Sequence, residues 1–312
     1  MNCKNMPNIW DRTINISQST VIDLVQLQLG IKVEDIKLIG EGFDNVAYLI
    51  NNQIVFRFPR REIAVKLLQT ELELLPYIAS KISFNIPTPQ FIGKPSESYP
   101  FPFAGYFKIL GSSLCDITKP LVDSKTLAKE LASWLKELHS IEIKTDYKYN
   151  IEDNWRLDTK NRLEKATEFI NQYKTLYAAN GFNPPELIEV IQSFHTLKFK
   201  SFKPCHIHGD LYYKHIMVDE NLQATGLIDW GDTHVGHPGI DIAAALMIFT
   251  DRTLEEFFQT YGPVDKKVPA FRSLCHGLTL LPYAAKQQDS KFLQWSILAL
   301  GRSISLFKKE AL

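Results

Sequence analysis

The chain changes from strand-like to helix-like patterning near residue 110, and this change constrains the fold more than any other feature of the sequence. Three short β-rich runs come first, at Asp35–Ile39, Val46–Ile50 and Ile54–Phe58. Only a glycine-containing loop and an Asn-Asn pair separate them, and such short connections favour consecutive antiparallel strands. We therefore expect an α+β chain with a small antiparallel sheet in its first part.

One helix is predicted within this first part, over Arg61–Ser80, because apolar residues recur there at steps of three and four. Pro76 lies inside the pattern. Proline has no N–H and its ring crowds the preceding turn, so we expect the helix to kink or to end near Leu75. A further strand, Phe103–Leu110, then leads into a Gly-Ser-Ser connection.

Beyond this connection the chain is predicted to be mainly helical. Ser124 can cap a helix that carries a stripe of leucines, and two more helices are predicted at Glu186–Leu197 and Leu254–Tyr261. The expected domain division is residues 1–110 and residues 111–312.

Composition excludes several classes of protein. The 35 Lys and Arg residues balance the 35 Asp and Glu residues, so no global positive field favours nucleic acid as a partner. The four cysteines lie far apart and lack zinc-ligand spacing. The N-terminus has no apolar signal region, and the apolar run Ile242–Phe249 is too short to span a bilayer. We expect a soluble, cytoplasmic monomer that contacts neither nucleic acid nor membrane.

The segment Cys205–Ala243 carries the strongest chemical signal. Short strand-like runs alternate there with acids and histidines, and Asp210 and Asp229 each follow such a run. Two carboxylates at the ends of neighbouring strands can converge on one small volume. This arrangement suits magnesium-assisted phosphoryl transfer, in which one acid positions a hydroxyl and another holds the metal.

The motifs HGDLYYKHIMVD, GLIDWGD and HPGIDIA together resemble those of the aminoglycoside and macrolide phosphotransferase superfamily. The resemblance implies a two-lobed protein-kinase-like fold, with a nucleotide-binding N-lobe (1–110) and a C-lobe (111–312) holding the catalytic loop and the substrate helices. It also implies that Asp210 aligns the acceptor hydroxyl and that Asp241 braces the catalytic loop. Asp229 would bind Mg²⁺. His215, where many relatives have Asn, would bind the ion directly, act through water, or bond a phosphate or carboxylate.

The resemblance extends to the nucleotide side. It implies that the loop containing Gly40 and Gly42 covers the phosphates of ATP or GTP, and that Arg57 replaces the usual strand-three lysine. Glu71 would pair with Arg57, although Glu73 is a nearby alternative. The remaining residues implied to bind the nucleobase are the main chain of Phe107 and Ile109, with Tyr106 behind the base.

The sequence constrains the identity of the acceptor less than it constrains the type of reaction. An aminoglycoside, slightly favoured, would call for acids, whereas a macrolide would call for an apolar pocket. A metabolite kinase of the choline, homoserine, thiamine or sugar type and a regulatory pseudokinase are the alternatives. The candidate acids are Glu152, Asp153, Asp158 and Asp232. The candidate aromatic residues are Phe182, Phe194, Phe257, Tyr283 and Trp295, each of which could instead fill the helical core.

Overall fold

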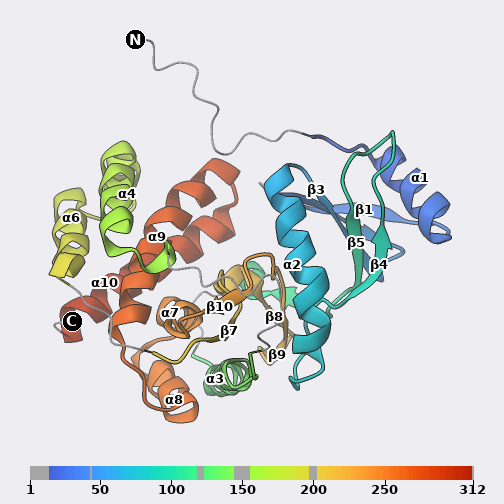
Figure 1. The fold of residues 1–312 in the computed structure, drawn as a ribbon. Coiled ribbons are helices and arrows are strands. Elements are labelled where there is room, and N and C mark those ends of the chain that lie inside the picture. Colours follow the sequence, from blue (N-terminus) through green and yellow to red (C-terminus); the bar gives the residue numbers. More distant parts are fainter. Residues whose placement is uncertain (1–13, 43, 118–122, 144–154, 197–201, 311–312) are drawn as a thin grey trace, which may run out of the picture. The chain divides into compact units, whose positions relative to one another are not determined.

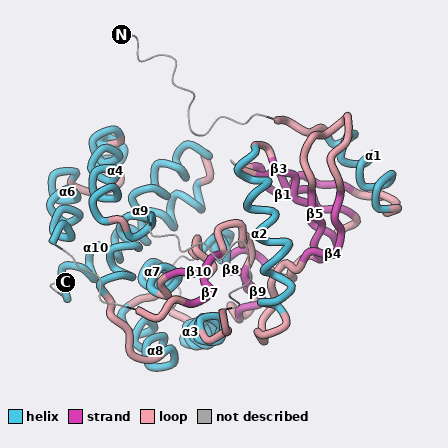
Figure 2. Tube along the Cα trace, viewed as in Figure 1, coloured by secondary structure: helices cyan, strands magenta, loops and turns pink. Residues whose placement is uncertain are grey.

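The computed structural model describes residues 14–42, 44–117, 123–143, 155–196 and 202–310 (Figure 1). The chain forms two compact units, which are treated separately below. The N-terminal unit comprises residues 1–80 and 86–109, and the C-terminal unit comprises residues 81–85 and 110–312. Figure 2 separates the strands and helices of each unit by colour.

A five-stranded antiparallel sheet forms the N-terminal unit, in the order β1-β2-β3-β5-β4. Its strands are β1 (Ile36–Glu41), β2 (Asn45–Ile50), β3 (Ile54–Pro59), β4 (Pro89–Gly93) and β5 (Phe103–Phe107). Asn51 and Asn52 both have positive φ angles, 51° and 56°. That conformation makes a tight turn, in which the Gln53 N–H donates to the Ile50 carbonyl at 3.0 Å. Three residues, 51–53, thus join β2 to β3, which pair directly, as predicted.

Two helices accompany this sheet, α1 (Gln18–Leu29) and α2 (Glu62–Ala79). Of the two outcomes expected at Pro76, a kink or an end near Leu75, the end is wrong, because α2 continues through Pro76 to Ala79. Pro76 lies close to the helix end, where its missing N–H removes only one hydrogen bond of the helix. Leu75 and Ile78 are fully buried on either side of it, and this packing holds the last turn in place.

The C-terminal unit is mainly helical. Its helices are α3 (Lys125–His139), α4 (Thr159–Gln172), α5 (Lys174–Ala179), α6 (Pro184–Gln192), α7 (Gly239–Ile248), α8 (Asp251–Tyr261), α9 (Lys267–Gln287) and α10 (Ser290–Glu310). As predicted, Ser124 caps α3, since its hydroxyl accepts a hydrogen bond from the Leu127 N–H. The predicted helix at 186–197 is α6 followed by a 3-10 turn, Ser193–Thr196, while residue 197 lies outside the described residues.

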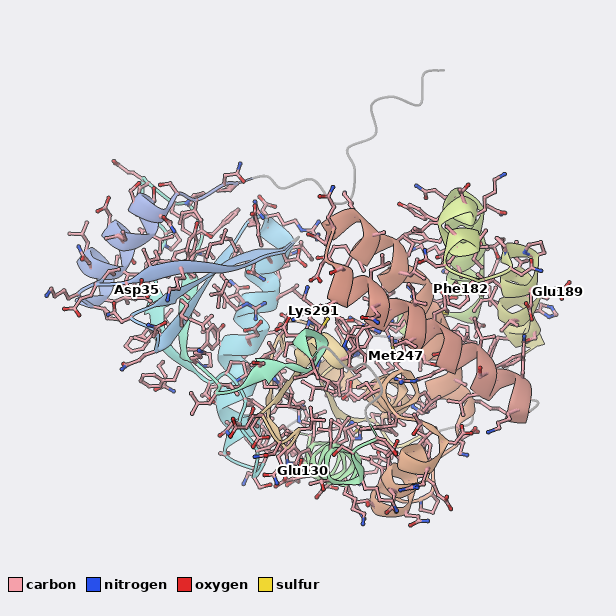
Figure 3. The ribbon with its side chains drawn as sticks, turned by 180° about the vertical axis from the view of Figure 1, so that it is seen from behind. Asp35, Glu130, Phe182, Glu189, Met247 and Lys291 are labelled. Atoms are coloured by element: carbon pink, nitrogen blue, oxygen red, sulfur yellow. The ribbon has the colours of Figure 1, made fainter. Side chains whose placement is uncertain are left out.

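The centre of this unit is α7, whose ten residues are all buried. It packs against α9, and α9 and α10 run alongside one another (Figure 1). Figure 3 labels Met247 on α7, whose main-chain carbonyl accepts a hydrogen bond from Arg302 of α10. The apolar run noted in the sequence is therefore the core of the unit. None of the described helices is long and apolar enough to cross a membrane.

Two small sheets in the C-terminal unit carry the acidic segment. The strands are β6 (Ser112–Ser113), β7 (Cys205–Ile207), β8 (Ile216–Val218), β9 (Ala224–Leu227) and β10 (His234–Gly236). Strand β7 pairs with β10, and β8 lies between β6 and β9. The side chain of Glu130 on α3, labelled in Figure 3, accepts a hydrogen bond from the Ala224 N–H and so ties β9 to that helix.

A buried histidine precedes α7 and links the stability of the fold to pH. Nδ1 of His237 accepts a hydrogen bond from the Gly239 N–H at 2.9 Å, which requires that nitrogen to be unprotonated. Burial lowers the pKa of His237 from its ordinary value of 6.5 to about 4, with Asp265 opposing the shift and His139 adding to it.

We predict that this histidine destabilises the fold in mild acid. Between pH 6.5 and pH 4 the unfolded chain binds a proton on His237 that the folded chain does not, so stability falls as the pH falls. The loss should be about 2 kcal/mol between pH 7 and pH 5. Urea unfolding of the wild type and of His237→Gln measures it as a change in their stability difference. A difference that is constant with pH would contradict the prediction.

Candidate active site

The loop after β7 is shaped by a glycine that nothing larger can replace. Gly209 has a φ angle of +85°, and a Cβ built on it would lie 2.2 Å from the main-chain oxygen of Asp232. Both the left-handed backbone and the lack of space exclude an L side chain here. The turn at Gly209 directs the next residue, Asp210, out of the strand, and 30% of the Asp210 side chain remains exposed.

A buried carboxylate braces this loop. Asp241, in the first turn of α7, is fully buried and accepts hydrogen bonds from the His208 N–H at 2.7 Å and the Gly209 N–H at 2.9 Å. His139 of α3 donates a third bond to it from Nε2, at 3.2 Å. Burial alone would raise the pKa of Asp241, but these donors and the nearby imidazoles outweigh it and lower the pKa. The geometry agrees with the bracing role that the resemblance implies for Asp241.

The His208 side chain joins the two acidic segments. Its Nε2–H donates to the main-chain carbonyl of Ile228 at 2.9 Å, and its Nδ1 accepts from the Asp210 N–H at 3.3 Å. Both bonds together require the neutral ring. Burial lowers the pKa of His208, in agreement with that form. One imidazole therefore fixes the distance between the Asp210 loop and the residue before Asp229.

Asp210, His215 and Asp229, predicted from sequence to act together, do lie together. His215 Nδ1 is 2.8 Å from the main-chain oxygen of Asp210, and its Nε2 is 3.3 Å from Oδ2 of Asp229. Asp229 has a φ angle of +63°, a left-handed conformation that costs free energy in a residue other than glycine. Such strain often marks a functional position, and here it places the Asp229 carboxylate beside the imidazole of His215.

This geometry fits a magnesium ion bound partly by the nucleotide. Because a carbonyl only accepts hydrogen bonds, Nδ1 of His215 carries a proton, and Nε2 is then the nitrogen available to a metal or its water. Within the described residues no three acid, histidine or cysteine side chains form a metal-binding group. Mg²⁺ commonly takes only one or two protein carboxylates and completes its shell with phosphates and water. Asp229 would supply one such carboxylate, with His215 beside it.

Two residues of α9 that sequence reasoning missed contact Asp210. Arg272 NH2 and His276 Nε2 lie 3.2 Å and 3.4 Å from its Oδ1. Burial, followed by the Asp232 charge, raises the pKa of Asp210, and His215, Arg272 and Arg156 oppose that rise. Arg272 and His276 stand four residues apart on one helix face. The sequence shows this spacing, but the spacing does not indicate which segment of the chain the helix face contacts.

The N-terminal unit holds a second set of interacting polar residues, some of which were predicted from the sequence. Arg57 of β3 forms an ion pair with Glu71 of α2 at 2.7 Å, and the Tyr106 hydroxyl donates to the other Glu71 oxygen at 2.8 Å. Glu71 is only 2% exposed, so it does not merely decorate a solvated helix face, whereas Glu73 is exposed. The structure thus selects Glu71 as the partner of Arg57, and Tyr106 fixes its orientation.

The other residues predicted to bind nucleotide occupy the ends of strands in the same unit. Gly40 lies in β1, and Gly42 closes a tight hairpin by donating its N–H to the Asn45 carbonyl at 2.9 Å. Phe107 ends β5 with 58% of its surface exposed, and Ile109 follows it as a half-buried residue. Their roles toward a nucleotide remain predictions.

The residues suggested for the acceptor have other partners where they are described. The Asp158 carboxylate caps α4 by accepting from the Asn161 N–H, and Asp232 pairs with Arg156. Glu152 and Asp153 lie outside the described residues. Among the aromatic candidates, Phe194, Phe257 and Trp295 are buried, whereas Phe182 and Tyr283 are half-buried; Figure 3 labels Phe182 beside α4 and α6. The buried aromatics fill the helical core.

Comparison with known proteins assigns the chain to a family. A sequence profile of the phosphotransferase enzyme family, APH, matches residues 35–274. The chain belongs to this family. It is 25% identical over 271 residues to the uncharacterized protein YcbJ of Bacillus subtilis (strain 168), a match that covers 79% of this chain and 82% of that protein.

Solved structures agree with this assignment. The GDP and kanamycin complex of APH(2")-IIia is 25% identical to this chain, with a TM-score of 0.68 and coverage of 90% of this chain and 97% of that one. Macrolide 2'-phosphotransferase type I shares the fold at 19% identity, with a TM-score of 0.61 and coverage of 91% and 98%. The antiparallel sheet unit and the mainly helical unit match the predicted protein-kinase-like fold, which is confirmed.

We predict that Asp241→Asn destabilises the protein. The amide keeps the shape of the carboxylate but removes its charge and turns an NH₂ group toward one of three donors. The unpaired buried donors and the lost carboxylate charge should together lower the free energy of unfolding by about 3 kcal/mol. Urea unfolding measures this cost. The matched change at exposed Asp23 should stay within about 0.5 kcal/mol of the wild type, and an equal effect of both variants would refute the bracing role.

Proposed function

We propose that this phosphotransferase moves the γ-phosphoryl group of ATP or GTP to a hydroxyl of a small molecule. The observation that carries the proposal is the convergence of Asp210, His215 and Asp229 in the C-terminal unit. There Asp229 has a strained backbone, and the hydrogen bond from Nδ1 fixes the tautomer of His215. The Asp210 carboxylate is partly exposed. The three residues occur in the order of the family motifs.

In this proposal Asp210 is the residue that meets the acceptor. Its carboxylate accepts a hydrogen bond from the acceptor hydroxyl and aligns the oxygen for in-line attack. The transition state of phosphoryl transfer is loose, so orientation contributes more than early proton removal. The raised pKa of Asp210 makes its carboxylate a better proton acceptor later in the reaction, when the hydroxyl proton must leave.

Asp229 and His215 would hold Mg²⁺, which when bound neutralises charge on the phosphates. His208 and Asp241 keep both loops in place by main-chain hydrogen bonds. In the N-terminal unit, Arg57 would contact phosphate with Glu71 and Tyr106 holding its side chain in position. Arginine offers a planar pair of donors where lysine offers a point charge.

Relatives suggest the first acceptors to test. The complex with GDP and kanamycin makes an aminoglycoside the leading candidate and GTP a candidate donor, and the macrolide relative supplies a second class. Small metabolite alcohols belong in the same assay, because fold alone does not fix the acceptor. A regulatory pseudokinase would bind nucleotide without any turnover that depends on Asp210.

We predict that Asp210→Ala abolishes transfer while the fold and nucleotide binding survive. Loss of the residue that aligns the hydroxyl should lower kcat by about 10²–10⁴-fold or more. A coupled assay with ATP and GTP across the acceptor panel measures the loss, and calorimetry measures nucleotide affinity. Asp23→Asn serves as a control and should match the wild type. Unchanged turnover in Asp210→Ala would remove the proposed mechanism.

We predict that Asp229→Ala raises the magnesium concentration needed for half-maximal activity and also suppresses the maximum. Losing a protein ligand of a metal should weaken its binding by about tenfold or more, since even supporting residues contribute that much. The measurement is a magnesium titration at saturating nucleotide. A normal magnesium dependence in this variant would remove Asp229 from the metal site.

A further inference from the structure

Three arginines gather around the acidic loop of the C-terminal unit. Arg272 of α9 contacts Asp210, and Arg156 of the short 3-10 turn Trp155–Leu157 pairs with Asp232. Burial raises the pKa of Cys275, and Arg162 of α4 lies close enough to oppose that rise. Arg162 is also close enough to Arg272 to contribute to lowering the pKa of that arginine. The group draws on three separate elements that pack on one another.

The local charge is positive. Three guanidinium groups face two carboxylates, those of Asp210 and Asp232. Burial lowers the pKa of Arg272 to about 10, so this arginine stays charged at neutral pH. The side chains of Arg156 and Arg272 are only 5% exposed, and each is paired with one of these carboxylates, as buried charges require. The cluster therefore has one more positive than negative group, and the extra positive group is the half-buried Arg162.

Hydrogen-bond donors in the cluster also lack acceptors. The Nε–H groups of Arg162 and Arg272 are buried and find no hydrogen-bond partner within the described part of the chain. Buried polar groups are rarely left in this state. A carboxylate or phosphate is acceptor-only, carries the missing charge and matches the planar donor geometry of a guanidinium.

The cluster lies beside the partly exposed side chain of Trp155. The guanidinium groups of Arg156 and Arg162 lie 4.5 Å and 5.1 Å from the centroid of its ring, while 49% of Trp155 is exposed. Contact with the aromatic ring limits the freedom of both arginines, so less entropy is lost when they bind a ligand. A bracing role toward Asp210 would need Arg272 alone and does not account for Arg162, which interacts with the Cys275 side chain instead.

We propose that the acceptor is an alcohol that also carries a carboxylate or phosphate, bound by Arg162 with Arg156 and Arg272 while its hydroxyl faces Asp210. This inference rests on the proposed function and narrows its acceptor. A polycationic aminoglycoside would be repelled by the same three charges, and a macrolide would leave the buried donors unpaired. Hydroxy acids and sugar phosphates are the two sources of the shared chemistry.

Inorganic sulfate tests the anion site without knowledge of the acceptor. Sulfate is titrated into the full chain saturated with Mg²⁺ and ADP, and binding is followed by calorimetry. Arg162→Met should weaken sulfate binding by about tenfold or more, the equivalent of one charge-assisted hydrogen bond, and Arg162→Lys should recover part of it. Lys160→Met is the matched control, because Lys160 is exposed and lies two residues away, on nearly the opposite side of α4. It should bind as the wild type does.

Two sulfate results would overturn the inference: no binding, or equal binding by the wild type and Arg162→Met. The second result would place the sulfate at a phosphate subsite of the nucleotide instead. Enzymatic turnover then shows whether hydroxy acids or sugar phosphates are the anionic acceptors. Hydroxy acids and sugar phosphates form the anionic arms of an acceptor assay, with kanamycin and neutral polyols as the opposing arms. In Arg162→Met the KM for an anionic acceptor should rise about tenfold or more while the KM for nucleotide stays unchanged.

Failure of this inference and failure of the proposed function give different results. Transfer to kanamycin or a polyol, with none to anionic alcohols, would overturn the acceptor class and leave the phosphotransferase intact. Nucleotide binding without any Asp210-dependent turnover would reject the proposed function, whereas the sulfate titration would still decide whether the arginines bind an anion.

Discussion

The candidate active site depends on one buried charge. Asp241 holds the main chain of His208 and Gly209 with the two oxygens of its carboxylate, and His139 supports it from α3. A buried carboxylate destabilises the fold unless both of its oxygens accept hydrogen bonds. The bonds that meet this need at Asp241 also fix the loop that precedes Asp210. Since α7, on which Asp241 lies, is buried throughout, the loop is anchored to the core of its unit.

Two histidines connect this loop to the other residues of the candidate site. His208 and His215 each use one ring nitrogen to bind a main-chain carbonyl, which fixes their tautomers and spacing. The result is that Asp229 is held in a strained conformation with its carboxylate beside an imidazole nitrogen. The strain is local, and the hydrogen bonds around it supply the compensating free energy. Such preorganisation is what an enzyme needs when catalysis is mainly alignment and electrostatics.

Arginines pair with acids in both units. In the N-terminal unit an arginine, Arg57, occupies the position expected for lysine and is held by Glu71. In the C-terminal unit buried arginines contact Asp210 and Asp232. Of the acids expected to attract a polycation, the two that the structure describes have other roles, since Asp158 caps α4 and Asp232 pairs with Arg156. Family membership indicates a phosphotransferase, and in the proposed function the charge around Asp210 bears on which alcohol can approach it.

Local patterns in the sequence determined the strands β7 and β8, the Ser124 cap and the grouping of Asp210, His215 and Asp229, because each depends on neighbours within a few residues or on an ordered motif. The passage of α2 through Pro76 was decided by tertiary packing, which outweighs one lost hydrogen bond. Packing also turned Arg272 toward an acid 62 residues earlier in the chain. A helical repeat predicts which residues share a face, but the element that meets this face is chosen by burial and charge across the whole unit.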